Sequence, residues 1–187
     1  MITFREAVLS DITPIMELER ACFNRDTRES ETAYRERIGA FPRGFIVMET
    51  GNEFAGAVSS ELWQYGPVIR RNTFTLGHSI TKQLKLSGDE LYISSIGVFP
   101  QYRKQGYGEL LFRALIDHVK ASFPRVTRGI LLINEEWKAA RKIYARNGFY
   151  DVAVFDDFFT ADDGTKTRGI VMRNDAITGL PDFPGGL

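Results

Sequence analysis

The stretch from Leu91 to Lys120 constrains the fold of this chain more than any other part of it. Residues Leu91 to Phe99 are apolar, β-branched and uncharged, which predicts a buried strand that Pro100 closes. A basic, glycine-spaced turn follows, and then apolar residues recur at steps of three and four, as in a helix with one buried face. A strand, a glycine turn and a helix in this order present free backbone N–H groups to an anion.

The turn has the composition of a phosphate-binding loop. Glycine at positions 106 and 108 would let a phosphate approach the backbone to hydrogen-bonding distance, and Arg103 and Lys104 add positive charge beside the helix N-terminus. The dinucleotide fingerprint is excluded because its third glycine is Leu111 here, and no Lys-Ser/Thr pair follows, as a nucleotide-triphosphate loop requires. Surface turns also favour these residues, so the spacing alone leaves a phosphate loop and an ordinary turn open.

Two motifs in this order resemble the GNAT superfamily of N-acetyltransferases. The first is Ile96-Gly97-Val98 followed by R-x-x-G-x-G, and the second is N-x9-Y-x3-G-F from Asn134 to Phe149; the resemblance covers about residues 2 to 173. It implies acetyl-CoA as co-substrate, with the pyrophosphate on backbone N–H groups of residues 103 to 109 and the pantetheine arm along residues 96 to 98. The residues expected at the cofactor are Ile96, Gly97, Val98, Arg103, Lys104, Gln105, Gly106, Tyr107, Gly108, Glu109 and Asn134.

Composition and charge are those of a single soluble domain. The chain has 187 residues, with 24 Lys and Arg against 24 Asp and Glu, and a net charge of zero argues against a nucleic-acid or membrane partner. No apolar run approaches the ~20 residues of a membrane span. The single cysteine, Cys22, fits a reducing compartment, and we interpret it as a small core residue. We expect a cytoplasmic domain over residues 1–173, a flexible tail over 174–187 and no metal; the oligomeric state, a homodimer included, is left open.

The remaining pattern predicts an α/β fold with a mixed sheet of about seven strands, splayed central parallel strands and helices on both faces. The segment 63–88 lacks a clear period, and we expect it to form part of the acceptor site with a short helix around residues 76–84. Within it, His78 is expected to be an exposed loop histidine rather than a base. Strands are expected at 2–7, 44–50, 54–62, 91–99, 128–133, 149–155 and 169–172, and helices at 12–22, 31–38, 108–120 and 137–147.

Acyl transfer from a thioester to an amine needs a base, a donor to the oxyanion and a proton for the departing thiolate. Tyr144 matches the tyrosine that many members of the family place beside the CoA sulfur, so it is expected to supply the proton. The resemblance implies the main-chain N–H of Val98 as the oxyanion donor, and Gly97 is expected to mark a bulge there. Asn134 is expected either to bond the pantetheine or to cap a helix.

The motifs leave the general base unassigned. One subgroup of the family carries a glutamate where Leu132 stands, and another carries histidines where Tyr92 and Ser94 stand. The candidates are therefore Glu61, Glu90 and a water relayed through Ser94 and Tyr92. The helices at 12–22 and 31–38 flank the acceptor cleft in this family, which makes Phe23 and Tyr34 candidates for lining it or for packing on the sheet.

The leading hypothesis is an N-acetyltransferase that moves the acetyl group of acetyl-CoA to a primary amine, in a small molecule or a peptide. The amine would attack directly in a ternary complex. The alternative is a CoA-binding sensor or interaction module that has lost catalysis, which the missing base favours and an intact Tyr144 opposes.

Overall fold

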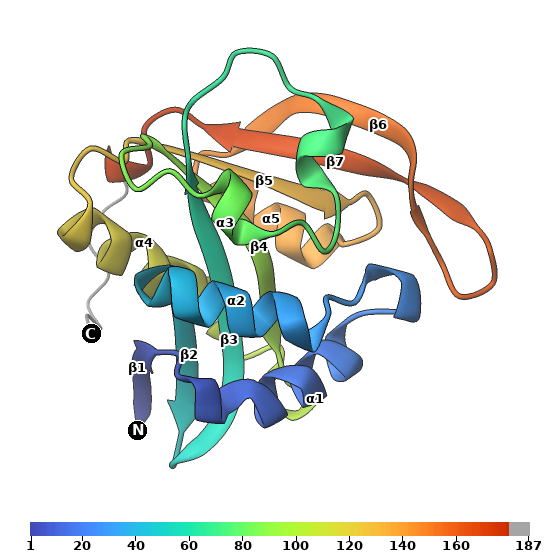
Figure 1. Ribbon diagram of the computed structural model, residues 1–187. Helices are drawn as coiled ribbons and strands as arrows, with labels where there is room; N and C mark the ends of the chain where they lie inside the picture. Colours follow the sequence, from blue (N-terminus) through green and yellow to red (C-terminus); the bar gives the residue numbers. More distant parts are fainter. Residues whose placement is uncertain (180–187) are drawn as a thin grey trace.

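The computed structural model describes residues 1–179 and has one seven-stranded sheet with the strand order β1-β2-β3-β4-β5-β7-β6 (Figure 1). Among the strands of residues 1–179, only β4 and β5 are parallel and every other neighbouring pair is antiparallel, so the predicted mixed sheet is confirmed. The strands are β1 (Ile2–Glu6), β2 (Phe45–Thr50), β3 (Glu53–Trp63), β4 (Glu90–Val98), β5 (Arg128–Asn134), β6 (Tyr150–Thr160) and β7 (Lys166–Asn174).

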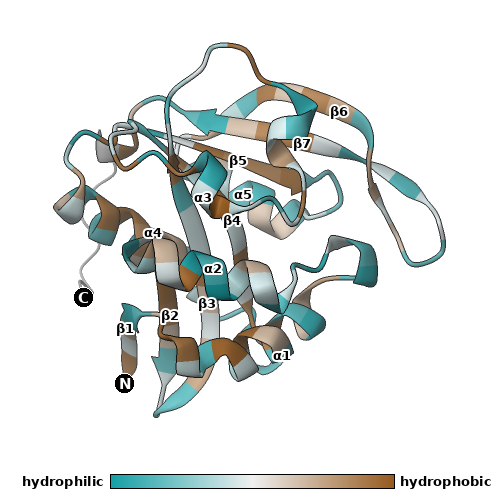
Figure 2. Cartoon of the chain, in the orientation of Figure 1, coloured by the Kyte–Doolittle hydropathy of each residue, from teal (hydrophilic) through white to brown (hydrophobic). Residues whose placement is uncertain are grey.

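Helices cover both faces of the sheet, as expected. They are α1 (Ile12–Cys22), α2 (Glu31–Ala40), α3 (Ile80–Gln83), α4 (Tyr107–Ser122) and α5 (Lys138–Arg146). The apolar sides of α1 and α2 pack with residues such as Val47 and Ala57 on one face. On the other face, α4 and α5 pack with residues such as Met48 and Leu131. Figure 2 shows the apolar stretches of α1 and of the strands at these contacts.

The pairing of β4 with β5 stops early, and this fork forms the centre of the molecule. Their register runs from the pair Glu90 and Arg128 to the pair Ile93 and Leu131 and goes no further. Beyond that point β4 and β5 no longer pair with each other, although β4 stays paired with β3 up to Val98. The predicted splayed parallel strands are therefore confirmed.

A bulge in β4 lies at Ser94, so the expectation of a bulge at Gly97 is wrong. The register with β3 shifts at this point, because Ser95 pairs with Ser59 while Ile93 pairs with Ser60. Gly97 has a different role: a Cβ there would lie 3.1 Å from the sulfur of Cys22, so glycine lets α1 approach the strand closely.

The edge of the sheet beyond β5 is longer than the sequence pattern predicts. β6 and β7 form a hairpin of eleven and nine residues, and β6 contains irregularities between Asp151 and Ala153 and between Phe155 and Phe159. In Figure 1 this hairpin extends past the body of the sheet towards the loop between α1 and α2. The irregularities interrupt the alternation from which strands are recognised, which explains the shorter prediction.

The expected boundary at residue 173 falls inside β7. Asn174 pairs with Gly129 in the sheet, and its amide donates to the carbonyl of Asn147 at 2.8 Å. Ile177 is fully buried, and its N–H donates to the carbonyl of Thr127 at 2.9 Å. The first part of the expected tail is thus docked on β5, and the expectation for residues 180–187 lies outside the described residues. Within residues 1–179, no helix has the length and apolar character that a membrane crossing requires.

Candidate active site

A run of consecutive backbone N–H groups at the start of α4 has no hydrogen-bond partner within residues 1–179. These N–H groups belong to residues 104 to 108. The flanking donors are used internally: Arg103 N–H bonds the Pro100 carbonyl at 3.2 Å, and Glu109 N–H bonds the Gly106 carbonyl at 3.0 Å. The free donors are therefore fewer than the 103–109 expected, yet they lie together at the positive end of a sixteen-residue helix.

The two glycines of the turn have different reasons to be glycine. Gly106 has a φ of 80°, in the left-handed region that favours glycine, and a Cβ there would meet nothing within 4 Å. At Gly108 a Cβ would make only an ordinary contact, 3.6 Å from Cδ1 of Ile143. Packing thus does not require glycine at 108, where it costs about 1 kcal/mol relative to alanine in a helix. The pair leaves the surface beside the free N–H groups open to a ligand.

Of the two basic side chains expected beside the N-terminus of α4, Arg103 makes its hydrogen bonds elsewhere. Arg103 turns inward, and its guanidinium donates to the Val98 carbonyl at 3.0 Å and to the Ala21 carbonyl and the Cys22 sulfur at 3.3 Å. These hydrogen bonds join β4 to the end of α1. The side chain of Glu109 accepts from Arg146 at 2.8 Å, and Lys104 and Gln105 are exposed. Lys104 remains as the basic side chain beside the free N–H groups.

The fork exposes a second set of backbone donors. Phe99 N–H bonds the Ala55 carbonyl at 2.9 Å, and donors alternate in direction along an antiparallel strand. The N–H of Gly97 therefore also faces β3, whereas those of Ile96 and Val98 face the gap that β5 has left. This geometry allows Val98 to donate to an oxyanion and Ile96 to donate to an amide-bearing arm.

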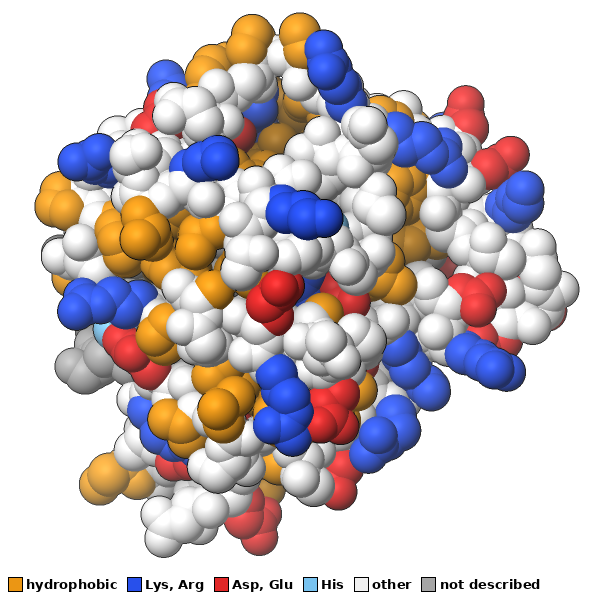
Figure 3. Space-filling model, in the orientation of Figure 1, with side chains coloured by type: hydrophobic (Ala, Val, Ile, Leu, Met, Phe, Trp, Pro, Cys, Tyr) orange, Lys and Arg blue, Asp and Glu red, His pale blue; other side chains and the backbone are white. Residues whose placement is uncertain are grey.

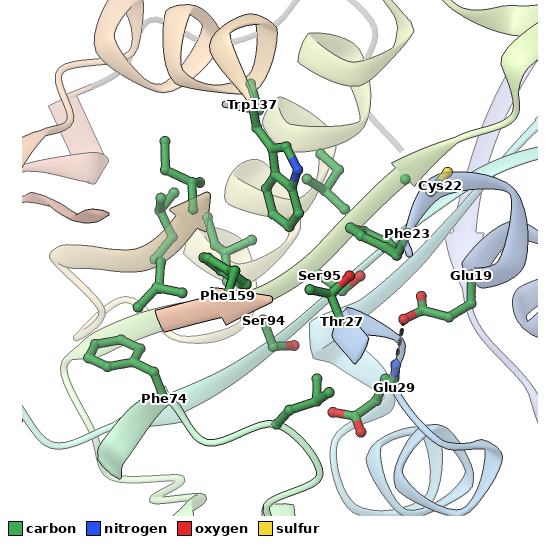
Figure 4. Close-up of a pocket in the computed structure, with 18 of the residues that line it drawn as sticks. Glu19, Cys22, Phe23, Thr27, Glu29, Phe74, Ser94, Ser95, Trp137 and Phe159 are labelled. Atoms are coloured by element: carbon green, nitrogen blue, oxygen red, sulfur yellow. Dashed lines mark hydrogen bonds between the residues drawn. The ribbon is translucent and has the colours of Figure 1, made fainter. Parts of the chain in front are cut away.

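A cavity of about 1050 Å³ joins the fork to the space between α1, α2 and the segment 63–88. Figure 3 shows apolar side chains gathered in the hollow between that segment and the β6–β7 hairpin. In the close-up, the carboxylates of Glu19 and Glu29 lie apart from the rings of Trp137, Phe159 and Phe74 (Figure 4). On the side of the fork the cavity is lined by Ile96, Gly97, Val98, Arg103, Leu131, Ile133, Ala139, Ala140 and Tyr144.

Tyr144 lies on α5 in the wall of this cavity, where the sequence predicts it. Its ring is 4% exposed and packs edge-on against Phe112, with ring centroids 5.6 Å apart. Burial raises the pKa of its hydroxyl, and within residues 1–179 this hydroxyl has no hydrogen-bond partner. The phenol is therefore neutral and free to donate to a group that enters the fork.

Ser94 and Tyr92 both line the cavity, as the relay hypothesis requires. The hydroxyl of Ser94 donates to the Ser59 carbonyl at 3.1 Å and lies 2.7 Å from the Ser59 hydroxyl. Tyr92 stacks on Trp63, with centroids 3.9 Å apart, and burial raises the pKa of its hydroxyl. Ser94 is thus held by β3, and Tyr92 is a poor proton acceptor.

Glu61 and Glu90, the two predicted candidates for a direct base, are not among the residues that line the cavity, and each is engaged by buried partners. Glu61 is 0% exposed and bonds His78 Nε2 at 2.7 Å, Trp63 Nε1 at 3.0 Å and Arg37 Nε at 3.4 Å. Glu90 is 2% exposed and is paired with Arg173 at 2.7 Å. Both carboxylates are bound to cations beneath the surface of the sheet.

His78 is not the exposed loop histidine that the sequence predicts. Its side chain is 11% exposed and lines the cavity, and both ring nitrogens face acceptors, namely Glu61 at 2.7 Å and the Thr75 carbonyl at 2.9 Å. Burial lowers the pKa of His78, but the hydrogen bond and charge of Glu61 outweigh it, and the pKa is raised. Because both ring nitrogens face acceptors, we interpret His78 as an imidazolium that donates from both nitrogens, and in that form it is not a base.

Glu19 is one of four acidic residues that line the cavity, with Asp26, Glu29 and Glu136, and the sequence motifs did not identify it. Its Oε1 accepts from the Glu29 N–H at 2.6 Å, and its Oε2 accepts from the Tyr34 hydroxyl at 2.7 Å. The same hydroxyl lies 3.3 Å from Oγ of Ser95, which places Glu19 above the bulge of β4. Burial raises the pKa of Glu19, these hydrogen bonds lower it, and burial prevails. The available signal was a carboxylate on the apolar side of α1, where Ile12 and Ile15 precede it.

Asn134 is not among the residues that line the cavity, and its side chain is engaged in the turn after β5, so its expected contact with pantetheine stays a prediction. Its amide nitrogen donates to the Thr167 hydroxyl at 2.8 Å, and its oxygen accepts from the Glu136 N–H at 3.0 Å. With 6% exposure it closes the turn after β5, which is close to the alternative of a capping role. Cys22 packs against the core cluster of α1 and α2, as expected, and it also lines the cavity, where burial raises its thiol pKa. Phe23 and Tyr34 line the cavity as well.

A forked mixed sheet with free donors at the N-terminus of α4 defines the class of fold, and comparison with known proteins identifies the family. The chain matches the family described as the acetyltransferase (GNAT) family over residues 12–149 and belongs to it. The [ribosomal protein bS18]-alanine N-acetyltransferase of Haemophilus ducreyi is 27% identical over 88 residues, which are 45% of this chain and 57% of that protein. The chain spans a little over half the length of the curated relatives it matches.

Two solved structures show the same fold at low sequence identity. The loading GNATL domain of CurA from Lyngbya majuscula superposes with a TM-score of 0.78 at 14% identity, over 95% of this chain and 98% of that chain. The GphF GNAT-like decarboxylase in complex with isobutyryl-CoA superposes with a TM-score of 0.74 at 15% identity, over 94% of this chain and 99% of that chain.

Within the described residues, His, Cys, Asp and Glu side chains form no group of three or more that could hold a metal ion.

Proposed function

We propose that this protein is an acyltransferase that moves the acetyl group of acetyl-CoA to a primary amine by direct attack in a ternary complex. The observation that carries the proposal is one cavity that joins the fork, with its free N–H groups, to the carboxylate of Glu19. Membership of the acetyltransferase (GNAT) family and the fold shared with an isobutyryl-CoA complex support a CoA-based acyl donor.

The residues present fit such a donor. The N–H groups of residues 104 to 108 and Lys104 would hold the pyrophosphate, because unpaired backbone donors at a helix N-terminus bind anions. The open edge of β4 would hold the pantetheine arm through Ile96, and an acetyl thioester supplies an activated acyl group there. The roles of Gly106 and Gly108 are to leave this approach free.

Glu19 would accept the proton that an ammonium group must lose before it can attack. A carboxylate with a raised pKa is better suited to this role than an ordinary one, because a base works best with a pKa near the working pH. Val98 N–H would donate to the carbonyl oxygen as negative charge develops on it. The Tyr144 hydroxyl, which is unpartnered within residues 1–179, would donate to the departing sulfur.

The sensor alternative was favoured by the absence of a base, and Glu19 removes that reason. The decisive experiment measures the release of free thiol from acetyl-CoA with a panel of primary amines. We expect turnover, and we expect Glu19→Gln to lower kcat/KM by roughly 10²-fold. The matched control is Glu17→Gln, an exposed residue of the same helix, which should leave kcat/KM unchanged. CoA binding without turnover of any amine would favour the sensor.

A further inference from the structure

The outer half of the cavity is walled by aromatic rings from four separate parts of the chain. Phe23 follows α1, Phe74 lies in the segment 63–88, Trp137 precedes α5, and Phe158 and Phe159 lie in β6; we call these five residues the aromatic wall. Ring centroids are 5.6 Å apart for Phe23 and Trp137, 5.5 Å for Trp137 and Phe159, and 5.0 Å for Phe158 and Phe159. Figure 4 labels the rings of Phe23, Phe74, Trp137 and Phe159 around the cavity.

Hydrogen bonds fix the elements that carry this wall. The Arg71 guanidinium donates to the carbonyls of Asp156 and Asp157 at 2.6 and 2.7 Å and lies 5.1 Å from the ring centre of Phe158. It thereby ties the segment 63–88 to β6. The Arg25 N–H donates to Asp162 at 3.2 Å and ties the tip of the β6–β7 hairpin to the loop after α1. The hairpin and the segment therefore bound a chamber, which suits a small molecule better than an extended peptide.

The inner end of the chamber carries more negative than positive charge. Glu29 is paired with Arg37 at 2.9 Å, and Glu61 is paired with His78. Glu19 has no cation within salt-bridge distance among residues 1–179, although it is 4% exposed. A buried carboxylate without a cation is costly, and an ammonium group of a ligand would relieve that cost.

We infer that the acceptor is a small primary amine with an aromatic body, its ammonium group at Glu19 and its ring against the aromatic wall. This inference rests on the proposed function and adds the substrate class to it. Aromatic pairs gain energy beyond the area that they bury, so a ring should be preferred to an alkyl chain of similar size. The carboxylate at the inner end selects the amine over neutral or acidic analogues.

The test compares kcat/KM for benzylamine, 2-phenylethylamine, 3-phenylpropylamine, n-hexylamine, ethanolamine and a peptide with an N-terminal alanine, with acetyl-CoA as donor. We expect the best phenyl amine to exceed ethanolamine by at least about 10-fold and n-hexylamine by roughly 2- to 12-fold. Phe159→Leu should abolish the preference over n-hexylamine, and Phe54→Leu, a half-buried phenylalanine outside the cavity, should retain it. Tryptophan fluorescence, from Trp137 in the aromatic wall and from Trp63, supplies a binding signal. 2-Phenylethylamine should quench the fluorescence of the CoA-loaded protein, and Glu19→Gln should weaken this binding at least about 10-fold.

The outcomes separate the two proposals. Turnover of amines with no preference for a ring, or with the peptide as the best substrate, would overturn the substrate class and leave the proposed function standing. Turnover of none of these amines would overturn both. A ring preference that survives in Phe159→Leu would also overturn the inference, because the wall would then not be its source.

Discussion

The Nε2 atom of His78 lies 2.7 Å from Oε1 of Glu61, beneath a cavity that only the histidine reaches. Arg37 and the indole of Trp63 also donate to this carboxylate, and together they lower the pKa of Glu61 against the effect of burial, which raises it. The pair holds the segment 63–88 to β3. We interpret it as a structural ion pair beside the cavity.

Removing the charge of Glu61 should destabilise the fold. Breaking a buried ion pair by removing one partner costs about 3–5 kcal/mol, because the other charge stays buried without compensation. We expect Glu61→Gln to lose about 3 kcal/mol of unfolding free energy in urea titrations. Glu17→Gln should change it by less than about 0.5 kcal/mol, since Glu17 is exposed. A loss as small as that of the control would show that the pair contributes nothing.

The same pair should make stability depend on pH. The pKa of His78 is raised above the unfolded value of about 6.5, so its contribution is complete below that pH and is lost as pH rises through the folded pKa. The unfolding free energy should therefore fall as the pH rises above about 6.5. In His78→Gln this fall should be reduced, and an unchanged pH profile would contradict the assignment of an imidazolium.

Blocking the free N–H groups should abolish CoA binding. Gly106→Glu places a side chain and a negative charge beside donors whose hydrogen bonds to phosphate contribute about 1.5–3 kcal/mol each, so we expect at least a roughly 10²-fold loss of affinity by calorimetry. The matched control is Gly164→Glu, because Gly164 has a similar φ of 84° and equally open surroundings but lies in the β6–β7 turn. Micromolar affinity retained in Gly106→Glu would refute the phosphate site.

Tyr144→Phe should lower turnover and leave KM for acetyl-CoA nearly unchanged. Loss of a general acid costs roughly 10²-fold in kcat. Tyr65→Phe removes a hydroxyl outside the cavity and should have no effect on turnover. Equal kcat values for the two variants would remove Tyr144 from the mechanism.

The pH dependence of kcat/KM should reflect the loss of the proton of the Glu19 carboxyl group. Because burial raises its pKa, the acid limb should fall above the ordinary value of about 4.3, with activity rising as the carboxyl loses its proton. Glu19→Gln should lack this limb. A limb that persists in the variant would assign the base to another group.

Local patterns predicted the strand–turn–helix unit, because Leu91 to Lys120 follows the strand and helix periods closely. The sequence also indicates the position of the bulge. The apolar residues of the strand fall on odd-numbered positions at Leu91 and Ile93 and on even-numbered positions at Ile96 and Val98, and Ser94 lies where this alternation changes. Gly97 suggests a bulge at its own position, three residues after that change. The paired serines were the better signal.

The polar part of the site could not be predicted in the same way. Glu19, Glu61 and His78 lie on a helix, a strand and an irregular segment, and only tertiary packing decides which of them faces the cavity. Glu61 and Glu90 looked alike in sequence, as acids at the ends of apolar strands, yet both are buried in ion pairs. A charged residue within an apolar period shows that a polar network exists, but the network's members come from distant positions.

The gap between β4 and β5 also affects how the protein behaves when nothing occupies it. Past Ile93 and Leu131 the sheet has two internal edges, and unpaired edges accept other extended chains. An amide-bearing arm laid along β4 would act as a substitute strand and prevent another chain from pairing with that edge. Resistance to aggregation would then belong to the ligand-bound protein more than to the polypeptide alone.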